Sequence, residues 1–250
     1  MRLFGPPSIK KLEANRDIGA LIAALQAADL KRRQDAAEAL GRLGDPQAGP
    51  ALIDALRDEA LRDVAAASLL MMAPEVMDVL VMTLRQANPL AAEASADPAV
   101  RAQVADILGF AGDDRAVDPL AAALGDVDEV GEAAVRALAN LGNPRAVDPL
   151  CAVLTRYGVL AIDALGQLGD PSATGAVVEW VMPQSHVRRD PNDAAAAIHA
   201  LGKIGPSGVV LPFIRRLANN CPGPGTPKGD IIQGAVSDAE ASLGVSVDRR

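Results

Sequence analysis

The chain has few of the side chains that build metal sites and disulfide frameworks. Its 250 residues include only two histidines and two cysteines, Cys151 and Cys221. Two cysteines are too few for a disulfide framework, so we expect reduced thiols and a cytoplasmic location. The four residues also show no spacing typical of metal ligands. We therefore expect no metal, no cofactor and no catalytic residues.

Long apolar segments and an excess of basic residues are missing as well. No segment approaches the roughly 18 uncharged apolar residues of a membrane span, and residues 1–11 lack the apolar run of a signal peptide. The formal net charge is −8, and an acidic chain is a poor default binder of nucleic-acid phosphates. We expect neither a membrane nor a nucleic acid to be its partner.

Aromatic residues are also scarce, with three Phe, one Trp and one Tyr. Half of the chain is nevertheless hydrophobic, so Ala, Leu and Val must fill the interior. Alanine is the best helix former and lets neighbouring helices approach closely. The composition therefore favours an all-α protein with closely packed helices.

A short phrase recurs along the chain. It reads ALGRLGDPQA at 39–48, LGFAGDDRA at 108–116, ALANLGNPRA at 137–146, ALGQLGDPSA at 164–173 and, more weakly, ALGKIGPSG at 200–208. A degenerate copy at 61–84 has a turn one residue shorter. The spacing is about 27–30 residues with insertions of around ten. Such a period indicates stacked copies of one small unit.

The third copy shows what one unit is. Residues 100–108 place apolar side chains at helical spacing, which predicts a first helix, helix A. Gly109 and Gly112 are expected to end helix A, because glycine tolerates the left-handed conformation of helix ends. Asp113 can cap the following turn. A second helix, helix B, then carries apolar residues four apart at Leu120 and Leu124, so each unit is a helix–turn–helix.

These features predict an α-solenoid with atypical ends. Residues 17–25 match a helix B without a clear helix A, and residues 231–243 match a helix A without a helix B. We expect a single domain with an N-terminal cap at 1–28, six repeats at 29–218, and a loop with a capping helix at 219–250.

The pattern VRxxxAxxLG followed by GDxRAVxPLxxAL resembles the short HEAT-like repeat of the phycobilisome-lyase type, over nearly the whole chain. Proteins with this repeat include bilin lyases, scaffold and adaptor proteins, and deoxyhypusine hydroxylase. The hydroxylases bind iron through repeated His-Glu pairs, whereas neither His186 nor His199 is followed by Glu. The resemblance implies a helical solenoid whose B helices line a concave groove.

Alignment of the copies on the second glycine of the phrase sorts helix B into columns. Two columns are expected to face the core: Leu52, Leu80, Leu120, Leu150, Val177 and Phe213, and four residues later Leu56, Leu84, Leu124, Leu154, Val181 and Leu217. The two columns between them are expected to face the groove: Asp54, Met82, Ala122, Ala152, Glu179 and Arg215, and Ala55, Thr83, Ala123, Val153, Trp180 and Arg216.

Two further features concern the edges of the repeats. Arginine occupies one column at the start of helix A, at Arg33, Arg62 and Arg101, and this arginine column is expected to pair with acids of neighbouring repeats. Later copies have Gly131, Gly158 and Ala194 there.

Insertions at 88–98, 183–192 and 219–229 lie between a helix B and the next helix A. They are either a binding edge or neutral lengthening of surface loops.

The most specific binding hypothesis concerns the C-terminal third. Trp and Arg are enriched at binding hot spots, and an inserted loop joins the groove columns there. The candidate residues are Glu179, Trp180, His186, Arg188, Arg189, Arg215 and Arg216. The alternative is a solvated turn with Trp180 packed on a neighbouring helix. His199 and Cys151 are interpreted as a helix-face residue and an inert small hydrophobe.

We therefore expect a non-catalytic protein-interaction scaffold whose partner is another protein, attracted to the arginines through an anionic patch. A bilin-lyase-like or other role with a small ligand at the Trp180 cluster is the alternative. Nucleic-acid binding by HEAT-like repeats is a second alternative, disfavoured by the acidic charge and the few aromatic residues.

Overall fold

The computed structural model describes residues 7–85, 97–181, 191–205, 207–219 and 225–244. These residues form helices and turns, with no strand among them. None of the described helices is long and apolar enough to cross a membrane. The contacts divide the chain into two compact units, Met1–Leu141 and Gly142–Arg250, and each is described by itself.

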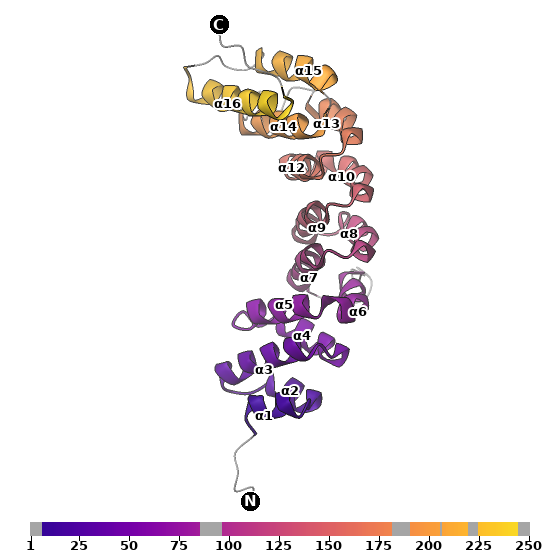
Figure 1. Cartoon of the computed structure of the whole chain (residues 1–250), viewed down its shortest axis with the longest axis vertical. Coiled ribbons are helices and arrows are strands. Elements are labelled where there is room, and N and C mark those ends of the chain that lie inside the picture. Colours follow the sequence, from indigo (N-terminus) through magenta and orange to yellow (C-terminus); the bar gives the residue numbers. More distant parts are fainter. Residues whose placement is uncertain (1–6, 86–96, 182–190, 206, 220–224, 245–250) are drawn as a thin grey trace, which may run out of the picture. The chain divides into compact units, whose positions relative to one another are not determined.

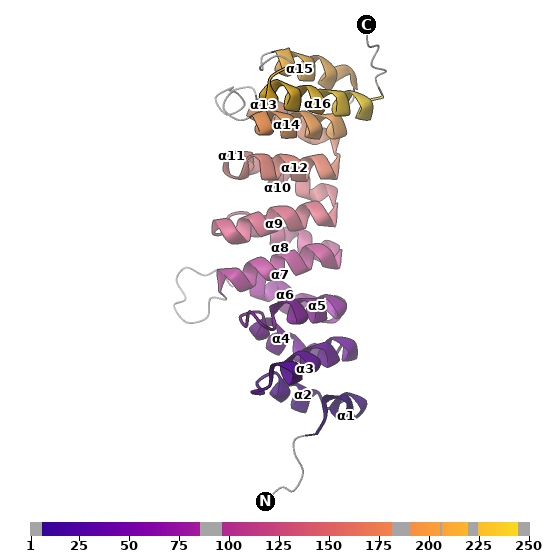
Figure 2. The same ribbon diagram turned by 90° about the vertical axis from the view of Figure 1, so that its left-hand side faces the viewer.

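In the first unit the helices alternate between two layers (Figure 1). The A helices are α1 (Ile9–Ala14), α3 (Leu30–Leu43), α5 (Arg62–Met71), α7 (Pro98–Ala111) and α9 (Asp128–Leu141). The B helices are α2 (Ile18–Ala24), α4 (Gly49–Ala55), α6 (Ala73–Arg85) and α8 (Val117–Ala123). Figure 2 shows α7 and α9 side by side with the same chain direction. The unit is thus a stack of helix–turn–helix repeats, as the sequence predicts.

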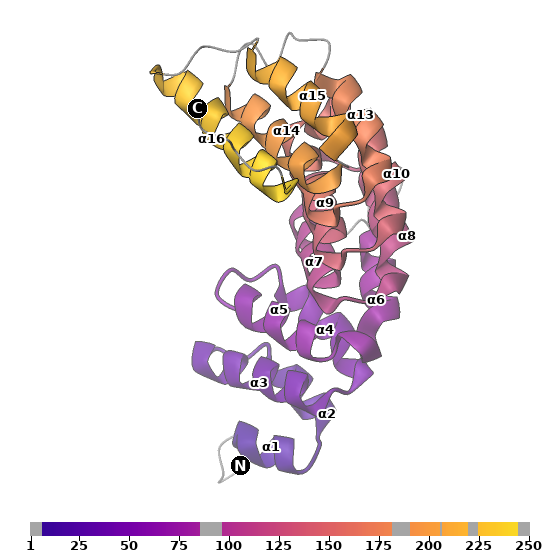
Figure 3. The same cartoon turned by 45° about the horizontal axis from the view of Figure 1, so that its top comes forward.

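The second unit continues the alternation. Its A helices are α12 (Val159–Leu168), α14 (Pro191–Ile204) and α16 (Pro227–Ser242). Its B helices are α10 (Val147–Ala152) with α11 (Leu154–Tyr157), α13 (Thr174–Val181) and α15 (Ser207–Asn219). Figure 3 shows α14 and α16 lying side by side, and α15 packs on both. Helix α16 has no helix B after it among the described residues, as expected for the last half-repeat.

The turns between helices A and B follow from their glycine and acidic residues. Gly44, Gly112, Gly142 and Gly169 all have φ between 64° and 70°, the left-handed conformation that lets helix A end. The next residue caps a 3-10 turn: the side chains of Asp45, Asp113, Asn143 and Asp170 each accept a hydrogen bond from the amide two residues later. This prediction from the phrase is confirmed.

The first glycine of the phrase has a different role from the one expected. Gly109 does not end its helix, because α7 continues to Ala111. A Cβ on Gly109 would lie 2.5 Å from the Cα of Ala137 on α9. Gly41, Gly166 and Gly202 face Ser68, Ala200 and Ala239 in the same way, at 2.8–3.0 Å. These glycines therefore allow the A helices to touch backbone to backbone.

Among the side chains whose burial the structure describes, the predicted core columns are buried with one exception. Leu52, Leu80, Leu120, Leu150 and Val177 are all 0% exposed. Phe213 was expected in this column and is only half-buried, whereas Val210 and Ile214 are 0% exposed. The register of α15 is shifted: Gly205 does not adopt the left-handed conformation of the equivalent glycines, and α15 begins at Ser207.

Only one of the two predicted groove columns is exposed throughout the first unit. Asp54, Met82 and Ala122 are exposed, but Ala55, Thr83 and Ala123 are buried, so the prediction for the second column was wrong there. The reason is that a packed helix buries a stripe at spacings of three and four residues. Each of these B helices packs against the helix A that follows it.

The N-terminal end also differs from the expectation. Residues 17–25 match a helix B, and the structure shows that a helix A precedes them. This helix is α1, which packs against α2 and α3 and buries Ile9 and Leu12. With only six residues, α1 shows too little periodicity to be recognised in the sequence. The domain boundaries after residues 28 and 218 stay predictions.

Candidate functional site

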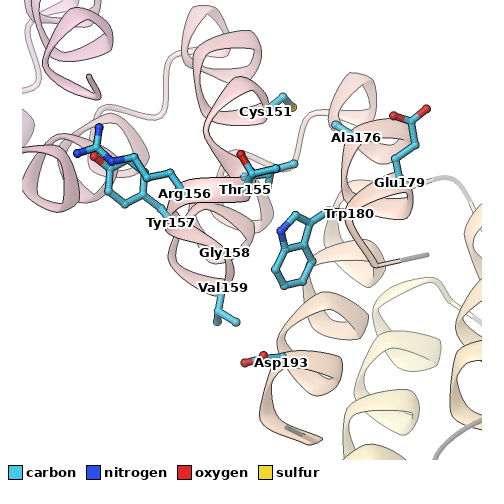
Figure 4. Close-up of a pocket in the computed structure, with 11 residues that line it drawn as sticks. Cys151, Thr155, Arg156, Tyr157, Gly158, Val159, Ala176, Glu179, Trp180 and Asp193 are labelled. Atoms are coloured by element: carbon cyan, nitrogen blue, oxygen red, sulfur yellow. The ribbon is translucent and has the colours of Figure 1, made fainter. Parts of the chain in front are cut away.

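The second unit contains an open cavity of about 660 Å³. It lies where the end of α11, the start of α12, helix α13 and the first turn of α14 meet (Figure 4). We call it the Trp180 pocket. Its lining consists of Cys151, Leu154, Thr155, Arg156, Tyr157, Gly158, Val159, Ala176, Glu179, Trp180 and Asp193.

Beside the pocket, helix B of this repeat is interrupted and is followed directly by the next helix A. Val153, at φ −107° and ψ 10°, separates α10 from α11. Gly158 then joins α11 to α12 at φ 50° and ψ −121°, a conformation that side-chain-bearing residues rarely adopt. The Trp180 ring carbon Cζ2 lies 3.5 Å from the place of a Gly158 Cβ. The indole therefore stands against bare backbone.

Charged side chains also line the pocket. Glu179 is exposed, and Asp193 is half-buried in the first turn of α14. Arg156 has its guanidinium carbon 5.1 Å from the Tyr157 ring centroid, and both side chains extend away from Trp180 (Figure 4). The lining of the pocket thus includes two carboxylates besides Trp180.

Cys151 lines the pocket without the features of a nucleophile. Burial, with a smaller contribution from the negative charge of Asp148, raises the pKa of its thiol. A raised pKa keeps the thiol protonated, and the thiolate is the reactive form. This agrees with the interpretation of Cys151 as an inert small hydrophobe.

The structure places the predicted site residues in different surroundings. Glu179 and Trp180 line the pocket together with Asp193, which the sequence reasoning missed. Arg215 instead pairs with Glu240 of α16, with both Nε and Nη2 3.0 Å from Oε1, and Arg216 is exposed on α15. His186, Arg188 and Arg189 lie outside the described residues, as do most of the first two predicted insertions and residues 220–224 of the third.

His199 is a helix-face residue, as predicted. Its Nδ1 lies 3.0 Å from the carbonyl oxygen of Ala195, one turn earlier on α14. Its Nε2 lies 3.1 Å from a carboxylate oxygen of Asp238 on α16. Within the described ranges, no three or more His, Cys, Asp or Glu side chains are grouped so that they could hold a metal ion.

The expected arginine pairing is confirmed at two of its three positions. Arg33 reaches Asp58 at 3.0 Å, and Arg101 binds both carboxylate oxygens of Asp126, at 2.8 and 3.2 Å. Each acid lies at the beginning of the next repeat. Arg62 differs, because its Nε donates to the carbonyl oxygen of Leu56.

The first unit has a cavity of about 410 Å³ around Arg33, which we call the Arg33 pocket. It is lined by Leu25, Gln26, Arg33, Asp54, Ala55, Arg57, Asp58 and Leu61. The Arg33 Nε is buried there with no hydrogen-bond partner among the described residues. A guanidinium thus fills part of a cavity between repeats.

Comparison with known families supports the repeat assignment. Residues 87–160 match the model described as HEAT repeats, and residues 33–58 match the PBS lyase HEAT-like repeat. The resemblance stated from the sequence is confirmed: the chain is an all-α repeat protein that contains HEAT-like repeats, one of them of the phycobilisome-lyase type. No curated protein matches the chain.

Several solved structures resemble the chain. Human deoxyhypusine hydroxylase in complex with glycerol is 19% identical with a TM-score of 0.41, over 94% of this chain and 88% of its own. The complex of CpcE and CpcF of phycocyanin lyase from Nostoc sp. is 22% identical with a TM-score of 0.35, over 93% and 85%. An engineered protein is 17% identical with a TM-score of 0.40, over 90% and 97%.

Proposed function

We propose that the chain is a non-catalytic scaffold that binds another protein, and that the partner contacts the Trp180 pocket. The observation that supports this most is Trp180 itself. In the first unit the same column of helix B is buried and holds only the small residues Ala55, Thr83 and Ala123. Trp180 is half-exposed at the rim of an open cavity, and tryptophan is among the residues most enriched at binding hot spots.

The rest of the proposed surface follows α13 and α15. Glu179 is exposed beside Trp180, and Arg216 is exposed on α15. Arg215 is exposed as well, although it pairs with Glu240. The proposal retains His186, Arg188 and Arg189 as further contact residues on the basis of the sequence alone. Stacked helices hold such a surface in one geometry, which lowers the ordering cost of binding.

The test is recovery of the partner from the native cell, with the full chain as bait. Trp180→Ala should retain the helical circular dichroism spectrum and lose the partner that the wild type recovers. The matched control is Met82→Ala, because Met82 is 62% exposed and occupies the column of Glu179 in the first unit. If Met82→Ala loses the partner and Trp180→Ala retains it, the binding surface lies in the first unit.

The contribution of the exposed arginines to partner binding is tested with separate variants. Arg216→Ala should reduce recovery without a change in fold, because this side chain is exposed. Absorbance that appears on mixing with a linear tetrapyrrole, together with unchanged protein recovery, would instead indicate a role in handling a small ligand.

A further inference from the structure

We propose that the first unit has a docking surface of its own, formed by the exposed side chains of Leu70, Met71 and Phe110, and that its occupant is a basic amphipathic helix of a partner protein. We call these three side chains the Phe110 patch. The inference goes beyond the proposed function, because it concerns the other unit and does not depend on Trp180.

One position near the end of helix A is polar in four repeats and apolar in two. It lies two residues before the second glycine of the phrase, or before Ala73 in the degenerate copy. The polar residues at this position are Arg42, Asn140, Gln167 and Lys203, all of them exposed. Helices α5 and α7 have Met71 and Phe110 instead, and these side chains are 62% and 67% exposed. The two apolar residues thus occur in consecutive repeats.

Contacts between A helices show that the short turn after α5 does not change its register. A Cβ on Gly41 would lie 2.8 Å from Ser68 of α5, and one on Gly109 would lie 2.5 Å from Ala137 of α9. In both contacts a residue three before one turn faces a residue five before the next turn. Helices α5 and α7 also contact each other in the A layer (Figure 2). The patch therefore lies at the same end of two neighbouring helices.

Exposed apolar side chains cluster at this place. Six large hydrophobic side chains are exposed among the described residues of the first unit, and three of them form the Phe110 patch. Single exposed apolar residues are normal on a protein surface, whereas contiguous ones mark interaction sites. Phe and Met are also enriched at protein interfaces relative to the rest of the surface. The patch therefore has the character of a docking surface.

Acidic side chains outnumber basic ones beside the patch, first on the side of α3. This helix packs against α5, and its Arg42 occupies the same position as Met71 and Phe110. The Arg42 guanidinium has two carboxylates as partners, Glu13 at 2.7 Å and Glu38 at 3.6 Å. The only base at this position next to the patch is thus already paired, and one negative charge is left over.

The other flanking charges have the same sign balance. Glu75, in the first turn of α6, is exposed and has no ion-pair partner among the described residues. Asp106 lies one helical turn before Phe110 on α7, and its carboxylate is 3.5 Å from Arg136. Each flanking arginine is therefore paired with a carboxylate of the chain, and the rim of the patch has a net negative charge.

The charge of the whole unit agrees with that of the rim. Residues 1–141 include 22 acidic and 14 basic residues, whereas residues 142–250 include ten of each. The first unit thus accounts for the entire net charge of −8. A second copy of the chain would bring the same acidic rim against this one and be repelled, whereas a basic partner is attracted.

A helix fits this surface better than an extended peptide. An extended segment gains affinity from backbone hydrogen bonds to a strand edge, but the backbone groups of α5 and α7 are used within their own helices. A helix satisfies its own backbone and needs only side-chain contacts. Neighbouring helices pack about 8–10 Å apart, and residues seven apart in a helix are separated by about 10 Å along its axis. A partner helix can therefore place one apolar residue on α5 and another on α7.

The first experiment measures binding of a designed probe to the full chain by fluorescence anisotropy at neutral pH and constant ionic strength. The probe is a labelled helical peptide with two leucines seven residues apart and lysines on its other faces. We expect saturable binding, about tenfold weaker binding when both leucines are replaced by serine, and none when the lysines are replaced by glutamate. Equal binding of the leucine and serine peptides, or no saturable binding, would overturn the proposal.

Apolar variants locate the binding. Phe110→Gln and Met71→Gln introduce the residue that α12 has at this position, Gln167, so the helical circular dichroism spectrum should not change. Each should weaken peptide binding by roughly three- to tenfold, because each removes one apolar contact. Met82→Gln is the matched control, since Met82 is equally exposed at 62% but lies on α6 outside the patch. If Met82→Gln weakens binding as much as the patch variants, the inference is wrong.

A charge variant tests the choice of a basic partner. Glu75→Gln should weaken peptide binding by roughly two- to fivefold, as expected for an exposed charge pair. Glu59→Gln is the matched control, because Glu59 is exposed before the start of α5, at the opposite end of that helix from Met71. Equal binding by both variants would show that the acidic rim does not select the partner and would overturn the assignment of a basic helix.

Two measurements exclude other occupants and other sites. If sedimentation velocity shows that the wild type dimerises and Phe110→Gln is monomeric, the occupant is a second copy and the proposal is overturned. Trp180→Ala should bind the peptide like the wild type, and loss of binding would place the peptide in the second unit and overturn the proposal. Failure of the proposed function has a different signature, since a partner recovered independently of Trp180 would leave all of these peptide results unchanged.

Discussion

Replacement of Gly109 by alanine tests the idea that glycine sets the distance between A helices. An added Cβ would lie 2.5 Å from the Cα and 2.7 Å from the Cβ of Ala137, much closer than atoms in van der Waals contact. The nearest atom belongs to the backbone of α9, so no side-chain rotation can relieve the clash. Helices α7 and α9 would have to move apart along a well-packed contact.

The expected net effect has two opposing parts. Overpacking of a core costs typically about 1–3 kcal/mol, and a clash between two backbones belongs at the upper end of this range. Alanine is favoured over glycine inside a helix by about 1 kcal/mol. Gly109→Ala should therefore lower the free energy of unfolding by roughly 2 kcal/mol, although the same substitution stabilises an isolated helix.

The matched control is Gly234→Ala. Gly234 lies inside α16, is exposed, and has nothing within 4 Å of an added Cβ. This variant should gain up to about 1 kcal/mol from helix propensity alone. Urea titrations followed by the helical circular dichroism signal compare both variants with the wild type. If Gly109→Ala is as stable as the wild type or more stable, backbone contact does not limit the spacing of α7 and α9.

Three further predictions concern other contacts. Leu120→Ala should cost roughly 2–5 kcal/mol in a urea titration and Ala122→Ser under about 1 kcal/mol, since only Leu120 is buried; equal losses would contradict the column assignment. Arg101→Ala should cost about 3–5 kcal/mol, because it leaves Asp126 buried without its arginine, and a loss under 1 kcal/mol would refute this. Partial desolvation raises the pKa of Asp163, although the residue is exposed to solvent, and the charges of Lys203 and His199 oppose the rise. Asp163→Asn should therefore stabilise the protein at neutral pH, with the gain disappearing below the ordinary Asp pKa; a pH-independent difference would contradict it.

The repeat boundaries could be predicted because their causes are local. A left-handed glycine followed by a capping Asp or Asn ends one helix and starts the next turn through contacts within a few residues, as at Gly112 and Asp113. Leucines four residues apart identify the buried face of helix B in the same way, as at Leu120 and Leu124. These features depend on backbone conformation and helical period, which neighbours in sequence decide.

The candidate site could be predicted only in part. Trp180 and Glu179 were identifiable because they depart from the small residues of the groove columns. Asp193 was missed because it lies one position before the arginine column, at the start of helix A. The equivalent residue in an earlier repeat is Leu61, which is apolar. The position of Asp193 at the pocket depends on how α14 docks beside α13. The pairing of Arg215 with Glu240 likewise joins residues of two different helices.

The sequence by itself therefore determined the class of fold, the helix ends and most of the core. The tertiary structure decided which residues meet across repeats: that Gly109 faces Ala137, that Ala123 is buried, and that Asp193 lines the same pocket as Trp180. The physical reason is the range of the interactions. Helix capping and periodicity act over a few residues, whereas a pocket exists only once helices about one repeat apart have packed against each other.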